Sequence, residues 1–229
     1  MRNQLWAEFL GTFALVFFGT GAVIVNEVTH GILSLLGVTM TFGVTVMVLI
    51  YTFGDISGAH FNPSVTLAFA LAKRFEAQRI LPFVAAQLAG GATASLVLRA
   101  LFPQPSSLGV TEPSGSVLQS LLLEMILTWF LMLVILNVSV GSKQKGITAG
   151  LVIGGVIVLE ATFAGPICGA SMNLARSFGP ALVTMNWKSL WIYVLGPTIG
   201  AVLAVPTMGL LRTPEGTMSE DEEMVAQSA

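Results

Sequence analysis

Long apolar runs, separated by short polar loops, dominate the chain. Six of these runs reach about 20 residues, the length with which an α-helix crosses a hydrocarbon layer roughly 30 Å thick. They lie near residues 5–26, 34–54, 79–102, 117–139, 146–164 and 189–211. The pattern therefore predicts six transmembrane helices.

Two of the connections, 55–78 and 165–188, are half apolar yet too short to cross a membrane and return. Each carries one copy of a repeated motif, which reads SGAHFNPSVT at 57–66 and CGASMNLARS at 168–177. The Gly, Ala and Asn of the two copies match in register. We expect each connection to dip into the membrane and to continue as a short half-helix.

The two copies of the motif divide the chain into two similar halves. Glu8 lies at the start of the first predicted span and Glu124 lies early in the fourth. Because each half has three spans, an odd number, the halves must have opposite orientations, as in the inverted repeats of membrane transporters. We expect one membrane domain over 1–229, with repeats at about 4–102 and 117–212, a linker at about 103–116 and an acidic tail at 213–229.

Composition supports a membrane protein, because 54% of the residues are hydrophobic and 10% are charged, against roughly 25% charged in a soluble domain. The lipid bilayer is therefore the expected partner, and nucleic acid is not. Positive charge gathers at the termini and on the loops that face them, at Arg2, Lys73, Arg74, Arg79, Lys143, Lys145 and Arg212, with Arg99 and Lys188 as exceptions. The positive-inside rule then predicts cytoplasmic termini in a multi-pass protein of the inner or plasma membrane.

The few nucleophilic and metal-binding side chains argue against an enzyme. One cysteine and two histidines favour neither a disulfide framework nor a metal site, and we expect no cofactor and no metal. A nucleophilic Cys168 would need His30 or His60 as its base, but His30 lies in an outer loop and His60 belongs to the repeated motif. A coupled transporter would need an ionisable group at the midplane, where the sequence offers Asn62 and Asn173.

Non-helical backbone inside a membrane must be buried in protein or line a wet cavity. The small residues of the motif suit such a place, and their carbonyls could accept hydrogen bonds from a passing solute. The expected pore-lining backbone is that of Gly58, Ala59, His60, Phe61, Gly169, Ser171 and Met172. The matched carboxylates Glu8 and Glu124 are expected to accept hydrogen bonds from loop N–H groups, with a proton relay as the alternative.

Asn62 and Asn173 are favourable N-caps for the two half-helices, and Pro63 suits a first helical position. Two helix N-termini would then meet near the midplane, each equivalent to about half a positive charge. Such an arrangement repels cations and protons. It leaves the side-chain amides of both asparagines free to donate hydrogen bonds to a neutral oxygen.

These motifs resemble the aquaporin, or major intrinsic protein, family over about residues 4–212. The resemblance rests on 57–62, on 169–173 and on 175–180, and the FAGPI segment at 163–167 is similar to nodulin-26-like channels and their bacterial relatives. It implies an all-α membrane fold of six transmembrane helices and two re-entrant half-helices, assembled as a homotetramer. Leu174 departs from the usual Asn-Pro-Ala motif, and Asp55 stands where members often have histidine.

The resemblance also implies a selectivity filter formed by Phe42, Ala161, Ala170 and Arg176. Water-selective relatives have a histidine at the position of Ala161, so the ring should be wider here. We expect a passive channel for water and small uncharged solutes, glycerol-like polyols or metalloid hydroxides such as boric acid and arsenite, that excludes protons and ions. A water-selective aquaporin is the alternative. Glu160 either contacts Arg176 or faces the outer water.

Overall fold

The computed structural model describes residues 1–103, 107–139 and 143–211, with backbone only for 143–147. The predicted acidic tail at 213–229, Arg212 and residues 104–106 near the start of the predicted linker lie outside the described residues.

Six long helices confirm the six predicted spans, and each is long and apolar enough to cross a membrane. They are α1 (Arg2–Val28), α2 (Ser34–Ser57), α4 (Ile80–Leu101), α5 (Val117–Val138), α6 (Lys143–Cys168) and α8 (Leu190–Leu211). Two shorter helices, α3 (Pro63–Leu71) and α7 (Leu174–Thr184), follow the two motifs, and a single 3-10 turn, η1 (Ala77–Arg79), precedes α4. The chain is an all-α membrane protein.

Two of the spans end later than the apolar pattern predicts. α2 continues to Ser57 and α6 to Cys168, a few residues past the expected ends at 54 and 164. Left-handed Gly58 (φ +88°) ends α2, and α6 runs through Pro166 before it ends. A proline inside a helix removes one hydrogen bond to residue i−4, and α6 nevertheless continues for two residues beyond Pro166.

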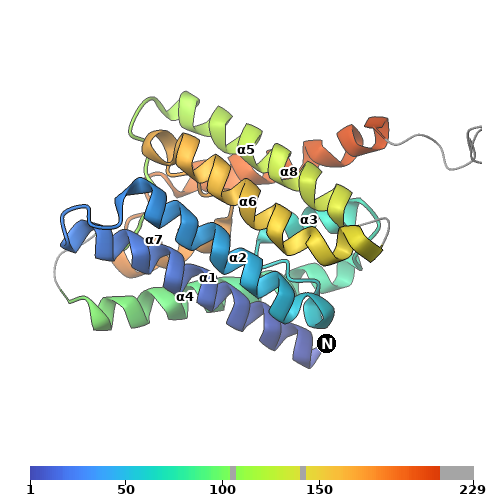
Figure 1. Ribbon diagram of the computed structural model, residues 1–229, viewed down its shortest axis with the longest axis horizontal. Coiled ribbons are helices and arrows are strands. Elements are labelled where there is room, and N and C mark those ends of the chain that lie inside the picture. The colour runs from blue at the N-terminus through green and yellow to red at the C-terminus, as the bar shows by residue number, and fades with distance from the viewer. Residues whose placement is uncertain (104–106, 140–142, 212–229) are drawn as a thin grey trace, which may run out of the picture.

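The long helices lie side by side, with α1 against α4 and α5 against α8 (Figure 1). Glycines allow these close contacts: a Cβ on Gly90 would collide with the carbonyl of Phe9, and a Cβ on Gly200 with that of Met125. Small residues serve this purpose between membrane helices. Across the halves, α3 packs against α8 and α7 against α4.

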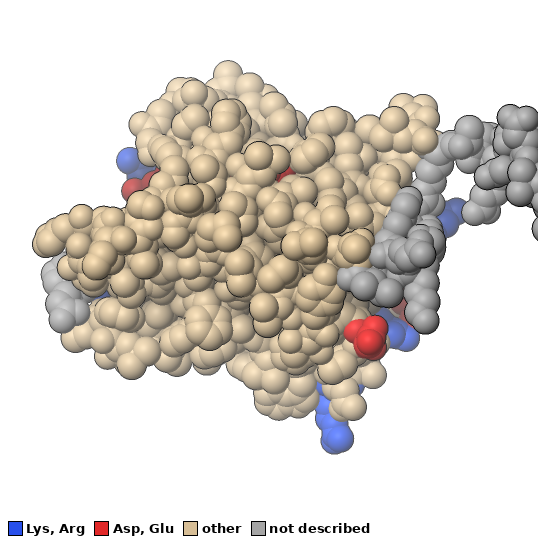
Figure 2. Space-filling view, in the orientation of Figure 1, with Lys and Arg blue, Asp and Glu red and all other residues tan. Residues whose placement is uncertain are grey.

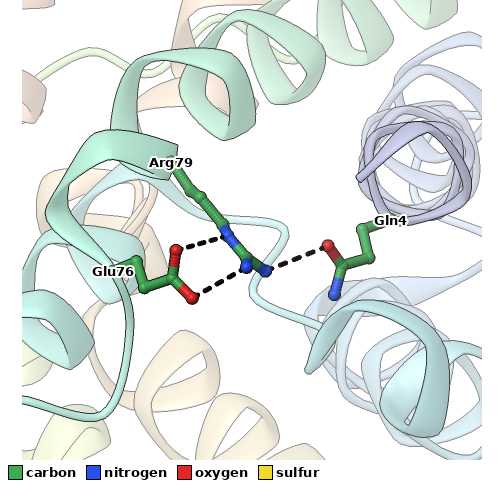
Figure 3. A network of polar contacts seen from close by, with 3 residues as sticks. All are labelled: Gln4, Glu76 and Arg79. Atoms are coloured by element: carbon green, nitrogen blue, oxygen red, sulfur yellow. Dashed lines mark hydrogen bonds and ion pairs between the residues drawn. The ribbon is translucent and has the colours of Figure 1, made fainter.

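The two half-helices lie toward opposite ends of the molecule, whereas the start of α1 and the end of α8 lie at the same end (Figure 1). Lys, Arg, Asp and Glu gather toward the two ends in Figure 2, and the face between them is almost entirely uncharged. At the end that holds the N-terminus, Arg79 forms an ion pair with Glu76 (2.7 Å) and donates to Gln4 of α1 (3.4 Å) (Figure 3). The loop before α4 is thereby tied to the first helix.

Candidate functional site

The two motif loops share an unusual backbone. Three residues of each have a positive φ: Gly58 (+88°), Ala59 (+52°) and Phe61 (+48°) in the first, and Gly169 (+83°), Ala170 (+39°) and Met172 (+53°) in the second. The loops therefore contain several residues in the left-handed region and are not simply extended. Left-handed φ costs a non-glycine residue about 1–2 kcal/mol, so the surroundings must hold these loops in place.

Glu8 of α1 supports the first loop and is fully buried. Its carboxylate accepts hydrogen bonds from the main-chain N–H groups of His60 (3.0 Å) and Phe61 (2.7 Å). It also accepts from the Ser57 hydroxyl (2.6 Å) and the Gln87 amide (2.8 Å). A buried carboxylate with four donors around it is well satisfied, since hydrogen bonds to a charged group offset its desolvation.

Glu124 of α5 holds the second loop at the corresponding positions. It accepts from the N–H groups of Ser171 (2.7 Å) and Met172 (2.8 Å). In the second half Cys168 takes the place of Ser57, and its Sγ donates to the carbonyl of Ala164 (3.5 Å). In both halves, therefore, two consecutive main-chain N–H groups of the loop donate to one buried carboxylate.

Both asparagines cap their half-helices in the same geometry. Asn62 (φ −151°, ψ 123°) accepts from the N–H of Ser64 (2.9 Å). Asn173 (φ −151°, ψ 111°) accepts from the N–H of Ala175 (2.9 Å) and, more weakly, of Arg176 (3.4 Å). α7 therefore begins in the same way as α3, although Leu174 replaces the proline.

Each asparagine also reaches across to the other loop. The side-chain amide of Asn62 donates to the carbonyl of Met172 (2.6 Å), and that of Asn173 donates to the carbonyl of Phe61 (2.8 Å). An Asn side chain has two N–H donors. One donor of each residue is thus already used, which corrects the expectation that both amides are free, and the second remains for a solute.

Two cavities of about 520 and 140 Å³ share Asn62 and Asn173 in their walls. The larger one is lined by Phe42, Ala161, Ala170 and Arg176, together with the loop residues Gly169, Ser171 and Met172. The smaller one is lined by Gly58, Ala59, His60 and Phe61. The two motif loops therefore line opposite halves of one hollow path whose centre is the pair of asparagines.

Arg176 is 6% exposed and lies between two partners. Its Nη1 donates to the main-chain carbonyl of Gly109 (2.6 Å), and its Cζ lies 5.2 Å from the centre of the Phe42 ring. Such a placement over an aromatic ring is a cation–π contact. The alanines at 161 and 170 contribute only methyl groups to the same cavity.

Several supporting side chains were not among the expected site residues. Thr66 receives a hydrogen bond from Gln87 (2.9 Å) and contacts Nδ1 of His60 (3.1 Å). In the second loop, Ser177 contacts the hydroxyl of Ser171 (2.5 Å). Thr66 and Ser177 occupy equal places in the repeated motif, which is the signal that could have identified them, whereas nothing in the sequence singles out Gln87.

Neither expectation for Glu160 describes its place in the structure. The residue is 4% exposed, so it does not face outer water. Both of its carboxylate oxygens lack a hydrogen-bond partner among the described residues, and Arg176 donates to Gly109 instead. Glu160 is therefore a buried carboxylate next to Ala161 that takes no part in the network around the loops.

Comparisons with known proteins agree with this geometry. A family model described as "Major intrinsic protein" matches residues 1–207. Aquaporin NIP1-3 of Oryza sativa subsp. japonica is 45% identical over 219 residues, which cover 95% of this chain and 77% of that protein. Aquaporin NIP3-1 of Arabidopsis thaliana is 42% identical over 226 residues, which cover 95% of this chain and 70% of that protein.

The fold has a counterpart among solved structures. The X-ray structure of the aquaglyceroporin from Plasmodium falciparum superposes with a TM-score of 0.81 at 25% sequence identity, and the match covers 91% of this chain and 99% of that one. Six spans, two facing half-helices and a family model that extends over nearly all of the described residues lead to one conclusion. The chain belongs to the major intrinsic protein family.

Proposed function

We propose that the chain is a passive channel for water and small uncharged solutes, namely glycerol-like polyols and metalloid hydroxides such as boric acid or arsenite, and that it excludes protons and ions. The path runs through the two cavities that meet at Asn62 and Asn173. The family consists of channels and not of enzymes, so the nucleophilic role considered for Cys168 is set aside.

The observation that carries the solute range is the pairing of Ala161 and Ala170 with Phe42 and Arg176 around the larger cavity. Two methyl groups and an aromatic ring form an apolar wall, and the guanidinium supplies fixed donors. A solute with a carbon edge and several hydroxyls contacts both surfaces. A histidine in place of Ala161 would narrow the ring, so this position favours the wider solute range over a water-selective aquaporin.

Exclusion of ions has two sources in this arrangement. The N-termini of α3 and α7 point toward the centre, and their partial positive charges oppose a cation there. The spare N–H groups of Asn62 and Asn173 donate to a neutral oxygen and so orient a passing molecule. Arg176 adds a full positive charge in the second half, where the first half has Val65 on the wall of the smaller cavity.

Flux measurements on protein reconstituted into liposomes test this proposal. Stopped-flow traces should show water, glycerol and boric acid entering faster than into empty liposomes. Fast water flux without flux of glycerol, urea or boric acid would instead establish a water-selective channel. Solute accumulation driven by an imposed pH gradient would establish a coupled transporter, and flux equal to that of empty liposomes would overturn the channel.

We further propose that both termini are cytoplasmic, that the membrane is the inner or plasma membrane, and that four copies assemble with one pore each. Cysteines introduced at His30, which follows α1, and at Gln78 in η1, both exposed and at opposite ends, test the orientation in a C168S background. An impermeant maleimide added to intact cells should label position 30 and leave position 78 unlabelled. The mass of the detergent-solubilised particle tests the tetramer.

A further inference from the structure

A tight turn at Ser107–Val110 forms part of the wall of the larger cavity. Leu108 (φ +51°) and Gly109 (φ +69°) are both left-handed, and the N–H of Val110 donates to the carbonyl of Ser107 (3.0 Å). Two consecutive positive φ values are typical of a type I′ turn. Since a left-handed leucine costs about 1–2 kcal/mol, contacts with the rest of the protein must hold this turn.

Three contacts tie the turn to α1. Glu27 accepts hydrogen bonds from the main-chain N–H of Ser107 (3.1 Å) and from its hydroxyl. Leu108 is 1% exposed and packs in a small apolar cluster with α1. Gly109 lies so close to the same helix that a Cβ would come within 2.9 Å of the Cβ of Thr20. The last turns of α1 therefore fix the position of this segment.

The same turn holds the side chain of Arg176, the arginine of the proposed filter. The N–H of Gly109 donates to the hydroxyl of Ser107 (3.0 Å), and the carbonyl of Gly109 accepts from Nη1 of Arg176 (2.6 Å). A continuous chain of hydrogen bonds thus runs from Glu27 to the guanidinium. We infer that Glu27, acting through Ser107 and Gly109, is a positioning residue for Arg176 and a determinant of solute selectivity; this inference rests on the proposed function.

The geometry also gives the direction of the effect. Without Glu27, Ser107 loses two acceptors and the left-handed turn relaxes, which moves the carbonyl of Gly109. That carbonyl is the hydrogen-bond acceptor that the described residues provide for the Arg176 side chain. When the carbonyl of Gly109 moves, the guanidinium loses this acceptor, donates to other oxygens that line the cavity and narrows the path. The permeability for a polyol should fall more than that for water, because a polyol fills more of the ring.

Three variants separate positioning from charge. E27A removes both acceptors of Ser107, and S107A removes the hydroxyl link while it leaves the charge of Glu27 in place. E112A is the matched control, because Glu112 is an exposed carboxylate on the wall of the same cavity whose described partner is the side chain of Asn186 (2.6 Å) and not the turn. Water and glycerol permeabilities are measured on the same liposomes for each protein.

We expect E27A and S107A to lower the glycerol-to-water permeability ratio about three- to tenfold, the equivalent of one lost hydrogen bond, and the double variant to add little beyond E27A. A ratio that stays at the wild-type value or rises in both variants would overturn the inference. The inference would also be overturned if the permeability ratio fell equally in E27A and E112A and did not change in S107A. If E27A does not fold, S107A alone decides. Absence of wild-type flux would instead contradict the proposed function.

Discussion

The side-chain amide of Asn173 donates to the main-chain carbonyl of Phe61 at 2.8 Å, across 112 positions of the sequence. The reciprocal bond runs from Asn62 to Met172. Each asparagine therefore performs two tasks at once, since its oxygen caps its own half-helix and its nitrogen fixes the loop of the other half. A substitution can keep one task and remove the other.

Asn173→Asp keeps a side-chain acceptor for the N–H of Ala175 but cannot donate to Phe61. It also places a negative charge where two helix N-termini otherwise repel cations. We expect water flux to persist and a cation leak to appear, measured by the collapse of an imposed sodium gradient in liposomes. Asn62→Asp should behave alike, because the two sites are equivalent. Tight cation exclusion in both variants would contradict this role of the asparagines.

Removal of the buried carboxylates should destabilise the protein to different degrees. Glu8→Ala removes the acceptor of two main-chain N–H groups, of the Ser57 hydroxyl and of one Gln87 N–H, and Glu124→Ala removes that of two main-chain N–H groups. Each buried unsatisfied donor costs about 1–3 kcal/mol. We expect both to lower the midpoint of thermal unfolding in detergent, Glu8→Ala more. Glu76→Ala is the control, because its exposed ion pair with Arg79 contributes at most about 1 kcal/mol. Equal midpoints in the three variants would argue against loop support.

Ala161→His should narrow the ring around the larger cavity. We expect glycerol flux to fall by roughly tenfold or more, since an added imidazole fills space that a polyol needs and leaves it no room to contact Arg176. Water flux should change much less. Ala161→Gly, which adds no bulk, serves as the control and should retain glycerol flux. Undiminished glycerol flux through Ala161→His would show that this position does not limit solute size.

Leu174→Pro should be tolerated. Proline is favoured at the first helical position, and Asn173 already has the extended backbone that precedes a proline well. We expect water flux equal to that of the wild type and a gain in stability of about 0.4–1 kcal/mol, because proline restricts the unfolded chain. Thermal unfolding and stopped-flow water traces measure the two quantities. A loss of flux would mean that α7 needs leucine at this place.

Gly200→Ala should loosen the contact between α5 and α8, because its Cβ would collide with the carbonyl of Met125. Backbone cannot give way as a flexible side chain does, so we expect a clear loss of thermal stability. Gly155→Ala is the matched control, since nothing lies within 4 Å of its Cβ position. There the better helix propensity of alanine, about 1 kcal/mol, should leave stability equal or higher. The reverse order would contradict this packing.

The parts of the fold that repeat or face lipid could be predicted from the sequence. Lipid demands about 20 apolar residues per span, so the six helices were visible, and the repeated motif located both half-helices. The matched positions of Glu8 and Glu124 pointed to loop support. The ends of α2 and α6 were predicted too early, because glycine geometry at 58 and 169 and not polarity ends these helices.

Contacts outside the repeat were not predictable. The carbonyl that holds Arg176 belongs to Gly109, in a loop with no counterpart in the motif and no side chain to mark it. Its place depends on a left-handed turn at Leu108, a residue type that gives no hint of such a conformation. The placement of the Arg176 side chain thus depends on backbone geometry that residue patterns do not carry.

The crossed amide bonds between Asn62 and Met172 and between Asn173 and Phe61 also impose an order on biogenesis. A ribosome makes the first loop more than a hundred residues before its partner, so the carbonyl of Phe61 and the amide of Asn62 must wait for their final partners. α3 waits as well, because it packs against α8, the last of the described helices to be synthesised. The nascent first half therefore enters the membrane without the contacts of its motif loop to the second half. These contacts are complete only when α8 has been inserted.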